Sequence, residues 1–415
     1  MLILYRILIN IVFIASPIII IFRLIKKKEN ILSLKEKFIF TLKKRKKGKA
    51  IWFHGASVGE IKSVIPLLEK FEKDKTISQI LITSNTLSSS KIINKIRLNK
   101  ITHQFFPIDS NFISKKFIDY WQPSKVFFID SEIWPNTIVN LAEKKIPIVL
   151  INGRITKKTF LRWKFLSSFS KKLFSNFSLC LSSSVESFNY LKKLNFKNVK
   201  FIGNLKFAQT ENENITINKD IKKKFNIKKT WCASSTHPGE ELLCGLVHID
   251  LKKKIKNILT IIIPRHTERA IEIKNNLEKL NLIVHLDEPK KKINEKTDIY
   301  LVNSYGKTKS FYKYSKNVFL GGSIVNHGGQ NPLEAVRFGC SILHGPNVTN
   351  FKEVYEFLKK NKISYKVNNQ KNLFNNLTRL FSKPAKNKKI QKKIRLTGNR
   401  ILKETYNEIC YATIK

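Results

Sequence analysis

Short apolar runs recur along the chain, and most of them lead through a polar turn into a segment with helix-like spacing of apolar residues. The runs are rich in isoleucine, valine and phenylalanine, which favour strands. Because strands alternate with helices, the pattern predicts an α/β fold with parallel sheets. The expected strands are residues 51–54, 80–83, 125–129, 147–151, 230–233, 259–263, 282–285, 299–302 and 318–320.

The alternation is interrupted by an Asn- and Lys-rich stretch, residues 210–229, which has few large apolar side chains. A chain of 415 residues also exceeds what one hydrophobic core usually supports. We therefore expect an N-terminal domain at 29–209, a linker at 210–229, a C-terminal domain at 230–383 and a basic helical segment at 384–415. Two similar halves imply a cleft between them, lined by the loops that follow the strands.

The N-terminus has a different pattern, because residues 7–22 are almost wholly apolar and lysines follow at 26–28. This arrangement predicts a membrane anchor helix over residues 1–28. A cleaved signal peptide is the alternative, weakened by Pro17 directly after the small residues that would mark cleavage. Basic residues on the C-terminal side of the anchor predict an inner-membrane protein with its catalytic domains on the cytoplasmic side.

The charge of the chain is strongly positive, with 78 Lys and Arg against 30 Asp and Glu and a formal net charge of +48. Such an excess raises nucleic-acid binding as a function class. The lysines are spread along the whole chain, however, and no RRM, zinc-finger or helix-turn-helix signature lies among them. We therefore expect inner-membrane lipids, and no nucleic acid, as partners. The 5 cysteines are widely spaced, which fits a reducing compartment and no zinc site.

A single carboxylate, Glu60, ends the small-residue turn that follows the strand expected at 51–54. Glycine allows a tight turn there, and the first amides of the next helix are free to receive a ligand. A carboxylate in this position can act as a general base. It can equally well serve only to complement the dipole of the following helix.

Two further carboxylates, Asp130 and Glu132, follow the strand expected at 125–129. A pair of carboxylates can bind a sugar or hold a proton, although either residue can instead cap the next helix. Lys206, near the end of the first half, could balance the charge of an acidic sugar or a leaving phosphate. The alternative for Lys206 is an ordinary solvated lysine.

Polar loops also follow the strands of the second half. Residues 234–241 place hydroxyls and His237 before an apparent helix, as either an N-cap or an anion site. Arg265, after the strand at 259–263, can bind a phosphate or carboxylate, unless it is only surface charge. A glycine-rich loop at 321–330 leads into a helix start that suits phosphate, and Glu334 could accept both hydroxyls of a ribose. The loop lacks the Walker ending and no metal-ligand spacing occurs, so neither ATP hydrolysis nor a metal site is expected.

These clusters, in this order, resemble the 3-deoxy-D-manno-octulosonic acid (Kdo) transferases, which attach Kdo from CMP-Kdo to a lipid A precursor. The resemblance extends over nearly the whole chain. The matching motifs are HGASVGE at 54–60, DSEIWPN at 130–136, INGR at 151–154, GNLKF at 203–207, SSTHPGEE at 234–241, PRHTER at 264–269, GGS with HGGQNPLEA at 321–335 and GPNVTNFKE at 345–353.

The resemblance implies an inverting glycosyltransferase of the GT-B fold, with two Rossmann-like domains facing a cleft. The acceptor, lipid IVA, would lie mainly on the first domain and CMP-Kdo on the second, in lipopolysaccharide core biosynthesis. Glu60 would be the general base, and Asp130 and Lys206 would stabilise the transition state. No metal or other cofactor is implied. The positions that match the family's CMP contacts are Pro264, Arg265, Tyr305, Gly306, Lys307, Asn331, Pro332, Leu333 and Glu334.

The chain departs from the family pattern at several of these places. Asp130 stands where the family usually has Glu, and Gln330 replaces a usual His. Residues 303–307 differ from a D-T-x-G-E-like pattern, so Lys307 reverses a charge beside the expected nucleotide. Two alternatives follow: a GT-B transferase with another nucleotide sugar or acceptor, or a non-catalytic basic protein that binds membranes or nucleic acid.

Overall fold

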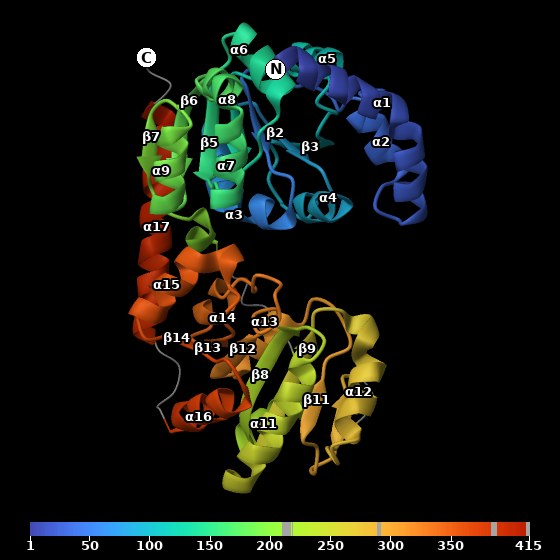
Figure 1. Ribbon diagram of the computed structural model, residues 1–415, viewed down its shortest axis with the longest axis vertical. Coiled ribbons are helices and arrows are strands. Elements are labelled where there is room, and N and C mark those ends of the chain that lie inside the picture. Colours follow the sequence, from blue (N-terminus) through green and yellow to red (C-terminus); the bar gives the residue numbers. More distant parts are fainter. Residues whose placement is uncertain (210–216, 218, 289–291, 383–387, 412–415) are drawn as a thin grey trace. The chain divides into compact units, whose positions relative to one another are not determined.

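The computed structural model describes residues 1–209, 217, 219–288, 292–382 and 388–411. It divides into two compact domains (Figure 1), the first formed by Met1–Thr210 with Leu396–Lys415 and the second by Glu211–Arg395. Residues 210–216 and 218 of the predicted linker, and the predicted boundary at 383–384, lie outside the described residues.

The first domain is built on a seven-stranded sheet in the order β3-β2-β1-β4-β5-β6-β7. All its strand pairs are parallel. Apolar side chains such as Trp52, Phe117 and Phe128 are fully buried and form its core. Its strands are β1 (Ala50–His54), β2 (Gln79–Ser84), β3 (Ile101–Phe105), β4 (Lys125–Ile129), β5 (Ile148–Gly153), β6 (Phe177–Ser182) and β7 (Val199–Phe201). Its helices after β1 are α3 (Val58–Glu72), α4 (Leu87–Ile93), α5 (Asn111–Trp121), α6 (Pro135–Glu143), α7 (Lys157–Phe165), α8 (Ser167–Phe174), α9 (Val185–Lys193) and η1 (Leu205–Ala208).

The second domain repeats this plan with a parallel sheet in the order β10-β11-β9-β8-β12-β13-β14. Because β9, β8 and β12 are neighbours, the loops at their carboxyl ends meet at one edge. Its strands are β8 (Lys229–Thr236), β9 (Ile258–Pro264), β10 (Val284–Leu286), β11 (Ile299–Leu301), β12 (Asn317–Leu320), β13 (Ser341–His344) and β14 (Ser364–Lys366). Its helices are α10 (Lys219–Ile227), α11 (Glu240–Lys254), η2 (Thr267–Arg269), α12 (Ala270–Glu278), α13 (Thr308–Tyr314), α14 (Leu333–Arg337), η3 (Thr349–Phe351), α15 (Lys352–Lys360) and α16 (Gln370–Phe381).

Helix α1 (Leu2–Ile25) covers the predicted anchor and is followed by α2 (Ile31–Lys37). Among the described helices, none combines the length and apolarity required to cross a membrane. Polar contacts fasten the start of α1 to the first domain: the Tyr5 hydroxyl donates to Asp109 at 2.8 Å, and Arg6 Nε donates to Asn136 at 3.0 Å. Asp109 is buried, so these contacts hold α1 to the region where α6 begins.

Helix α17 (Lys388–Tyr411) forms the C-terminal segment. From Leu396 onward it belongs to the first domain, where Lys125 Nζ donates to the carbonyl of Ile409 at 2.9 Å and Tyr406 packs on Phe71. The C-terminal helix therefore packs on the domain that begins the chain.

The apolar runs locate most strands of both sheets, including the edge strand β10, but miss several others. The strands absent from the prediction are β3, β6, β7, β13 and β14. Several of them are interrupted by polar residues, as in the Thr-His-Gln of β3 or the serines of β6, so they lack a continuous apolar signal. Helix α10 occupies part of the stretch predicted as a linker, because its lysines flank the buried Ile221.

Candidate active site

Glu60 lies in the first turn of α3, directly after the turn that leaves β1. Ser57 caps the helix, and the Glu60 carboxylate turns back to accept from the Ala56 amide at 2.6 Å and the Ser57 hydroxyl at 2.7 Å. This arrangement is a capping box. A Cβ on Gly55 would lie 3.2 Å from the Glu60 Cβ, so a larger residue there would crowd this turn. Glu60 therefore has a structural role at the helix start, where the sequence suggested that it complements the helix dipole, and a role as base has to coexist with this capping role.

The electrostatic surroundings of Glu60 are acidic. Burial, and then the charges of Asp130 and Glu132, raise the pKa of Glu60 to about 7, against the hydrogen bonds from Ser57 and Ala56. A carboxylate with this pKa is ready to accept a proton near neutral pH. The end of β1 and the end of β4 thus bring Glu60, Asp130 and Glu132 into one site.

Glu132 is held ionised by two ring donors. His54 Nε2 lies 3.1 Å from Glu132 Oε2, and Trp134 Nε1 donates to the same oxygen at 2.8 Å. Burial opposes ionisation, but these hydrogen bonds, together with the charge on His54, lower the pKa of Glu132. Glu132 therefore stays negatively charged beside Glu60, and this charge is one cause of the raised pKa of Glu60. His54 is the residue in this set whose role the motif alone did not predict.

Asp130 and Lys206 form an ion pair, with Lys206 Nζ 3.6 Å from Asp130 Oδ2 and both side chains mostly buried. Asp130 has a φ of 58°, in the left-handed region that aspartate tolerates better than most residues. Asn152, at the end of β5, donates to Asp130 and accepts from the Leu205 amide at 2.8 Å. Asn152 thus joins the Asp130 loop to the Lys206 segment. The sequence had placed Asn152 within a motif without assigning it a role.

In the second domain, amides of the glycine-rich loop donate hydrogen bonds to a carboxylate of the protein itself. Glu240, in the first turn of α11, accepts from the amides of Gly322, Ser323 and Ile324 at 2.7, 3.2 and 3.0 Å. It also accepts from the His237 amide at 3.0 Å. The amides at 322–324, at the start of the glycine-rich loop, are therefore already paired with Glu240, whereas the helix start that the sequence favoured for phosphate lies further on, at α14.

Cationic and imidazole side chains gather where β8, β9 and β12 end. His237 stacks on His327 with ring centroids 4.3 Å apart and meets His266 edge-on at 6.1 Å. Arg265 is exposed, and no hydrogen bond or ion pair joins its guanidinium to another described residue. These groups are suited to an anionic ligand. The sequence offered His237 as part of an N-cap or an anion site, but it did not bring His266 and His327 together with it, because their loops lie far apart in the sequence.

The predicted nucleotide contacts at 305–307 differ in whether their side chains are already paired within the protein. Tyr305 is exposed and its hydroxyl donates to Glu268 at 3.2 Å, while Glu268 also lies 3.3 Å from His266. Lys307 instead pairs with the buried Asp287 at 2.6 Å, which accounts for the charge that the sequence left unexplained. Gly306 offers its backbone. The Tyr305 loop therefore lies beside the loop that follows β9.

The remaining predicted contacts offer mainly backbone groups. Pro264 is buried at the end of β9, and Pro332 and Leu333 are buried at the start of α14. Asn331 Oδ1 accepts from the Leu333 amide at 3.1 Å, and Glu334 is half-buried in the first turn. In the parts of the chain that the structure covers, no group of three or more His, Cys, Asp or Glu side chains is arranged to hold a metal ion.

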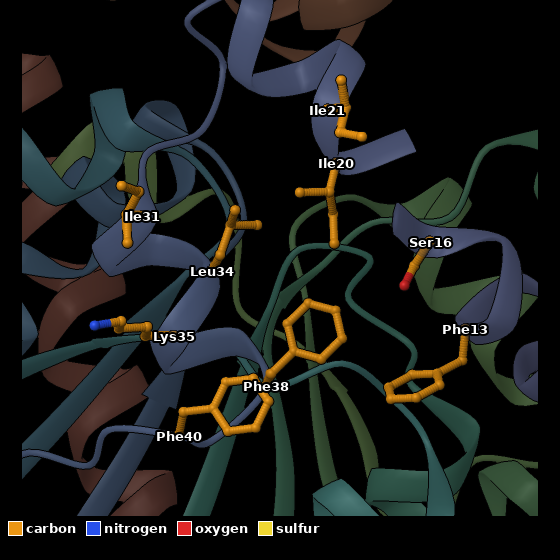
Figure 2. A pocket seen from close by; sticks show the side chains of 9 residues that line it. All are labelled: Phe13, Ser16, Ile20, Ile21, Ile31, Leu34, Lys35, Phe38 and Phe40. Carbon is orange, nitrogen blue, oxygen red and sulfur yellow. The ribbon is translucent and has the colours of Figure 1, made fainter. Parts of the chain in front are cut away.

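An apolar groove of about 750 Å³ lies between α1 and the segment that contains α2. Figure 2 shows side chains of both segments lining it. Phe13 of α1 lies 5.5 Å from Phe38 by ring centroids, and Phe38 packs in turn against the core of the first domain. Several lining side chains are exposed, among them Ile21, Ile31 and Phe40. The first domain therefore carries an open apolar surface on the same body as the acidic site.

Comparison with known proteins points to one family. The family model described as 3-deoxy-D-manno-octulosonic-acid transferase (kdotransferase) matches residues 32–209. The 3-deoxy-D-manno-octulosonic acid transferase of Rickettsia prowazekii (strain Madrid E) is 33% identical over 80% of this chain and 72% of its own length. The protein of the same name from Rickettsia bellii (strain RML369-C) is 32% identical over 87% of this chain and 86% of its own length.

Among solved structures, UDP-GlcNAc 2-epimerase from Neisseria meningitidis, bound to UDP-GlcNAc, is similar in fold. It is 14% identical, with a TM-score of 0.58, and the match covers 88% of this chain and 99% of that one. Similarity at this level shows the fold alone. Together with the two parallel sheets, it supports the predicted GT-B fold of two Rossmann-like domains.

Proposed function

Because this chain belongs to the 3-deoxy-D-manno-octulosonic acid transferase family, and so is a glycosyltransferase, we propose that it transfers Kdo from CMP-Kdo to a lipid A precursor, lipid IVA. The observation that carries the proposal is this similarity over most of the chain, and Glu60, a carboxylate with a pKa of about 7 in the first turn of α3, supports it. Transfer would take place in lipopolysaccharide biosynthesis.

In the proposed mechanism, the charged side chains of the acidic site in the first domain have distinct roles. Glu60 takes the proton from the acceptor hydroxyl as that oxygen attacks the anomeric carbon of Kdo. The bond from Kdo to the CMP phosphate breaks on the opposite face, so the configuration inverts. Lys206, which is paired with Asp130, places a fixed positive charge beside the reacting groups, where it stabilises the transition state. Burial, together with the charges of Asp130 and Glu132, keeps the pKa of Glu60 high enough for its carboxylate to accept this proton.

The second domain would bind the nucleotide. Arg265 is available for the phosphate, the backbone at Gly306 and the turn at 331–334 are available for the nucleoside, and Glu334 can accept from ribose hydroxyls. Since cationic side chains can neutralise the departing phosphate, the proposed reaction requires no metal or other cofactor.

Nucleotide preference and product mass test this proposal. We expect the purified full-length protein to bind CMP at least about tenfold more tightly than UDP or GDP, because a donor site discriminates by paired polar contacts. Incubation with CMP-Kdo and lipid IVA is expected to add the mass of Kdo to the lipid, as measured by mass spectrometry. Tighter binding of UDP, or no added mass, would contradict the proposed donor.

We propose that the protein associates with the inner membrane through α1 and the apolar groove, with both domains on the cytoplasmic side. Exposed apolar side chains on α1, such as Ile21 and Phe22, can enter the interface, while the lysines at 26–28 attract anionic head groups. A lipid acceptor would then be presented to the domain that holds Glu60.

Flotation with anionic liposomes tests this membrane association. The double substitution Ile21→Asp with Phe22→Asp is expected to lower the liposome-bound fraction, because each buried apolar side chain contributes about 1.5–3 kcal/mol. Ile271→Asp, at a residue of similar exposure in the second domain, is the matched control and should leave flotation unchanged. Equal flotation of the double variant and the control would contradict the assignment of α1 as the membrane-binding element.

A further inference from the structure

The imidazole of His237 is an unusual buried group in the second domain. The residue is 7% exposed, and its Nε2 atom has no hydrogen-bond partner among the residues that the structure describes. A buried polar atom without a partner is costly, so it normally meets a ligand, a water molecule or a neighbouring group. His237 follows β8, at the sheet edge where Arg265 also lies.

The glycine-rich loop is shaped around this ring. A Cβ on Gly322 would lie 3.1 Å from both Cδ2 and Nε2 of His237, so a larger residue would crowd the imidazole. The same Cβ would lie 3.5 Å from the side-chain nitrogen of Gln330. Gly322 has a φ of 64°, which also favours glycine. Glycine at this position therefore lets the loop backbone lie close to the atom of His237 that has no partner.

His327 covers one face of the ring, with the two imidazoles stacked at 4.3 Å between centroids. His327 is exposed, so its ring can turn aside without disturbing the core. Since Glu240 already occupies the amides at 322–324, an incoming anion has to be met by side chains instead. The imidazoles and Arg265 are the donors at this edge.

We propose that His237, with its stacking partner His327, binds an oxyanion of the donor substrate, and that Nε2 of His237 donates a hydrogen bond to that anion. The inference rests on the proposed function for the identity of the donor. The anion is either the phosphate of the nucleotide or the carboxylate of the acidic sugar. Both are recognised by the same chemistry, an N–H donor that can carry positive charge.

The charges around His237 make this binding pH-dependent. Burial, and then the neighbouring His327, lower the pKa of His237; His266 and Arg265 act in the same direction, and only Glu240 opposes them. Without a bound anion, the imidazole of His237 is therefore uncharged near neutral pH. An anion beside Nε2 favours the protonated ring, so binding takes up a proton and strengthens as the pH falls.

Calorimetric titration of the full-length protein with CMP, with cytidine and with free Kdo tests the inference. His237→Gln is expected to raise the Kd for CMP about tenfold, equivalent to about 1.4 kcal/mol, and to flatten its dependence on pH between about 6 and 8. His327→Gln, at an exposed position, should raise the Kd for CMP by a smaller factor. Cytidine lacks the phosphate, so its affinity should not change.

The arms of the experiment separate the two anions. A penalty on CMP assigns the phosphate to His237, whereas an unchanged Kd for CMP with weaker binding of Kdo assigns the carboxylate. His285→Gln, on β10 of the same domain, is the control and should bind like the wild type. If both ligands bind His237→Gln and His327→Gln normally, the inference is overturned. If the wild type prefers UDP, the proposed donor fails, and the same variants titrated with UDP still decide the role of His237.

Discussion

Replacing Glu60 with glutamine is expected to lower the rate of sugar transfer at least about a hundredfold while leaving the fold intact. Glutamine keeps the shape of the side chain and can still complete the capping box with Ser57. It cannot accept the proton of the acceptor hydroxyl. The substitution thus separates the two roles that the geometry allows for this residue, and steady-state transfer assays at saturating donor measure the difference.

Comparison with alanine sharpens this test. Glu60→Ala removes both the base and the cap, so it should also lower the stability of the protein by about 1 kcal/mol, as seen in thermal unfolding. Glu69→Gln, on the same helix but exposed, is the matched control and should behave like the wild type. Near-normal transfer by Glu60→Gln would assign the residue to helix capping alone.

Sequence reasoning locates the acidic site well because its members follow strong local signals. Asp130 comes directly after an apolar run and Glu60 ends the short turn that follows another, and adjacent parallel strands bring their carboxyl ends together. β1 and β4 are such neighbours, so the two carboxylates share a site although they are distant in the chain. What the pattern could not supply is the pKa of Glu60, which depends on burial and then on the charges of Asp130 and Glu132.

In the second domain, local sequence patterns do not predict which polar groups are already paired within the protein. A glycine-rich loop before a helix is typical of a ligand site, yet Glu240, in the first turn of α11, already accepts from the amides of this loop at 322–324. Motif spacing does not reveal which carboxylate folds into which loop. The ion pair of Lys307 with Asp287 is a similar case, since a charge that looks misplaced in the sequence has a buried partner. Contacts between distant loops, rather than element types, are what local pattern leaves undetermined.

Lys206→Met is expected to lower the transfer rate by roughly 10²–10³-fold, because a fixed charge beside the reacting group is lost in a site that is mostly closed to water. Methionine retains much of the length of the side chain. Lys200→Met, whose side chain is 51% exposed and paired with Glu408, is the matched control and should retain full activity. Near-normal transfer by Lys206→Met would show that the ion pair with Asp130 is structural.

The pH profile of this variant gives a second, independent result. Glu60 acts as a base only when ionised, so activity should rise with pH through about 7 in the wild type. Removing the positive charge of Lys206 leaves Asp130 unbalanced, which disfavours ionisation of Glu60 and moves the midpoint to higher pH. Asp130→Asn removes a negative charge near Glu60 and should move the midpoint the opposite way, to lower pH. Midpoints that shift in the same direction would contradict an electrostatic coupling of Glu60 to the Asp130–Lys206 pair, because the two substitutions change the local charge with opposite sign.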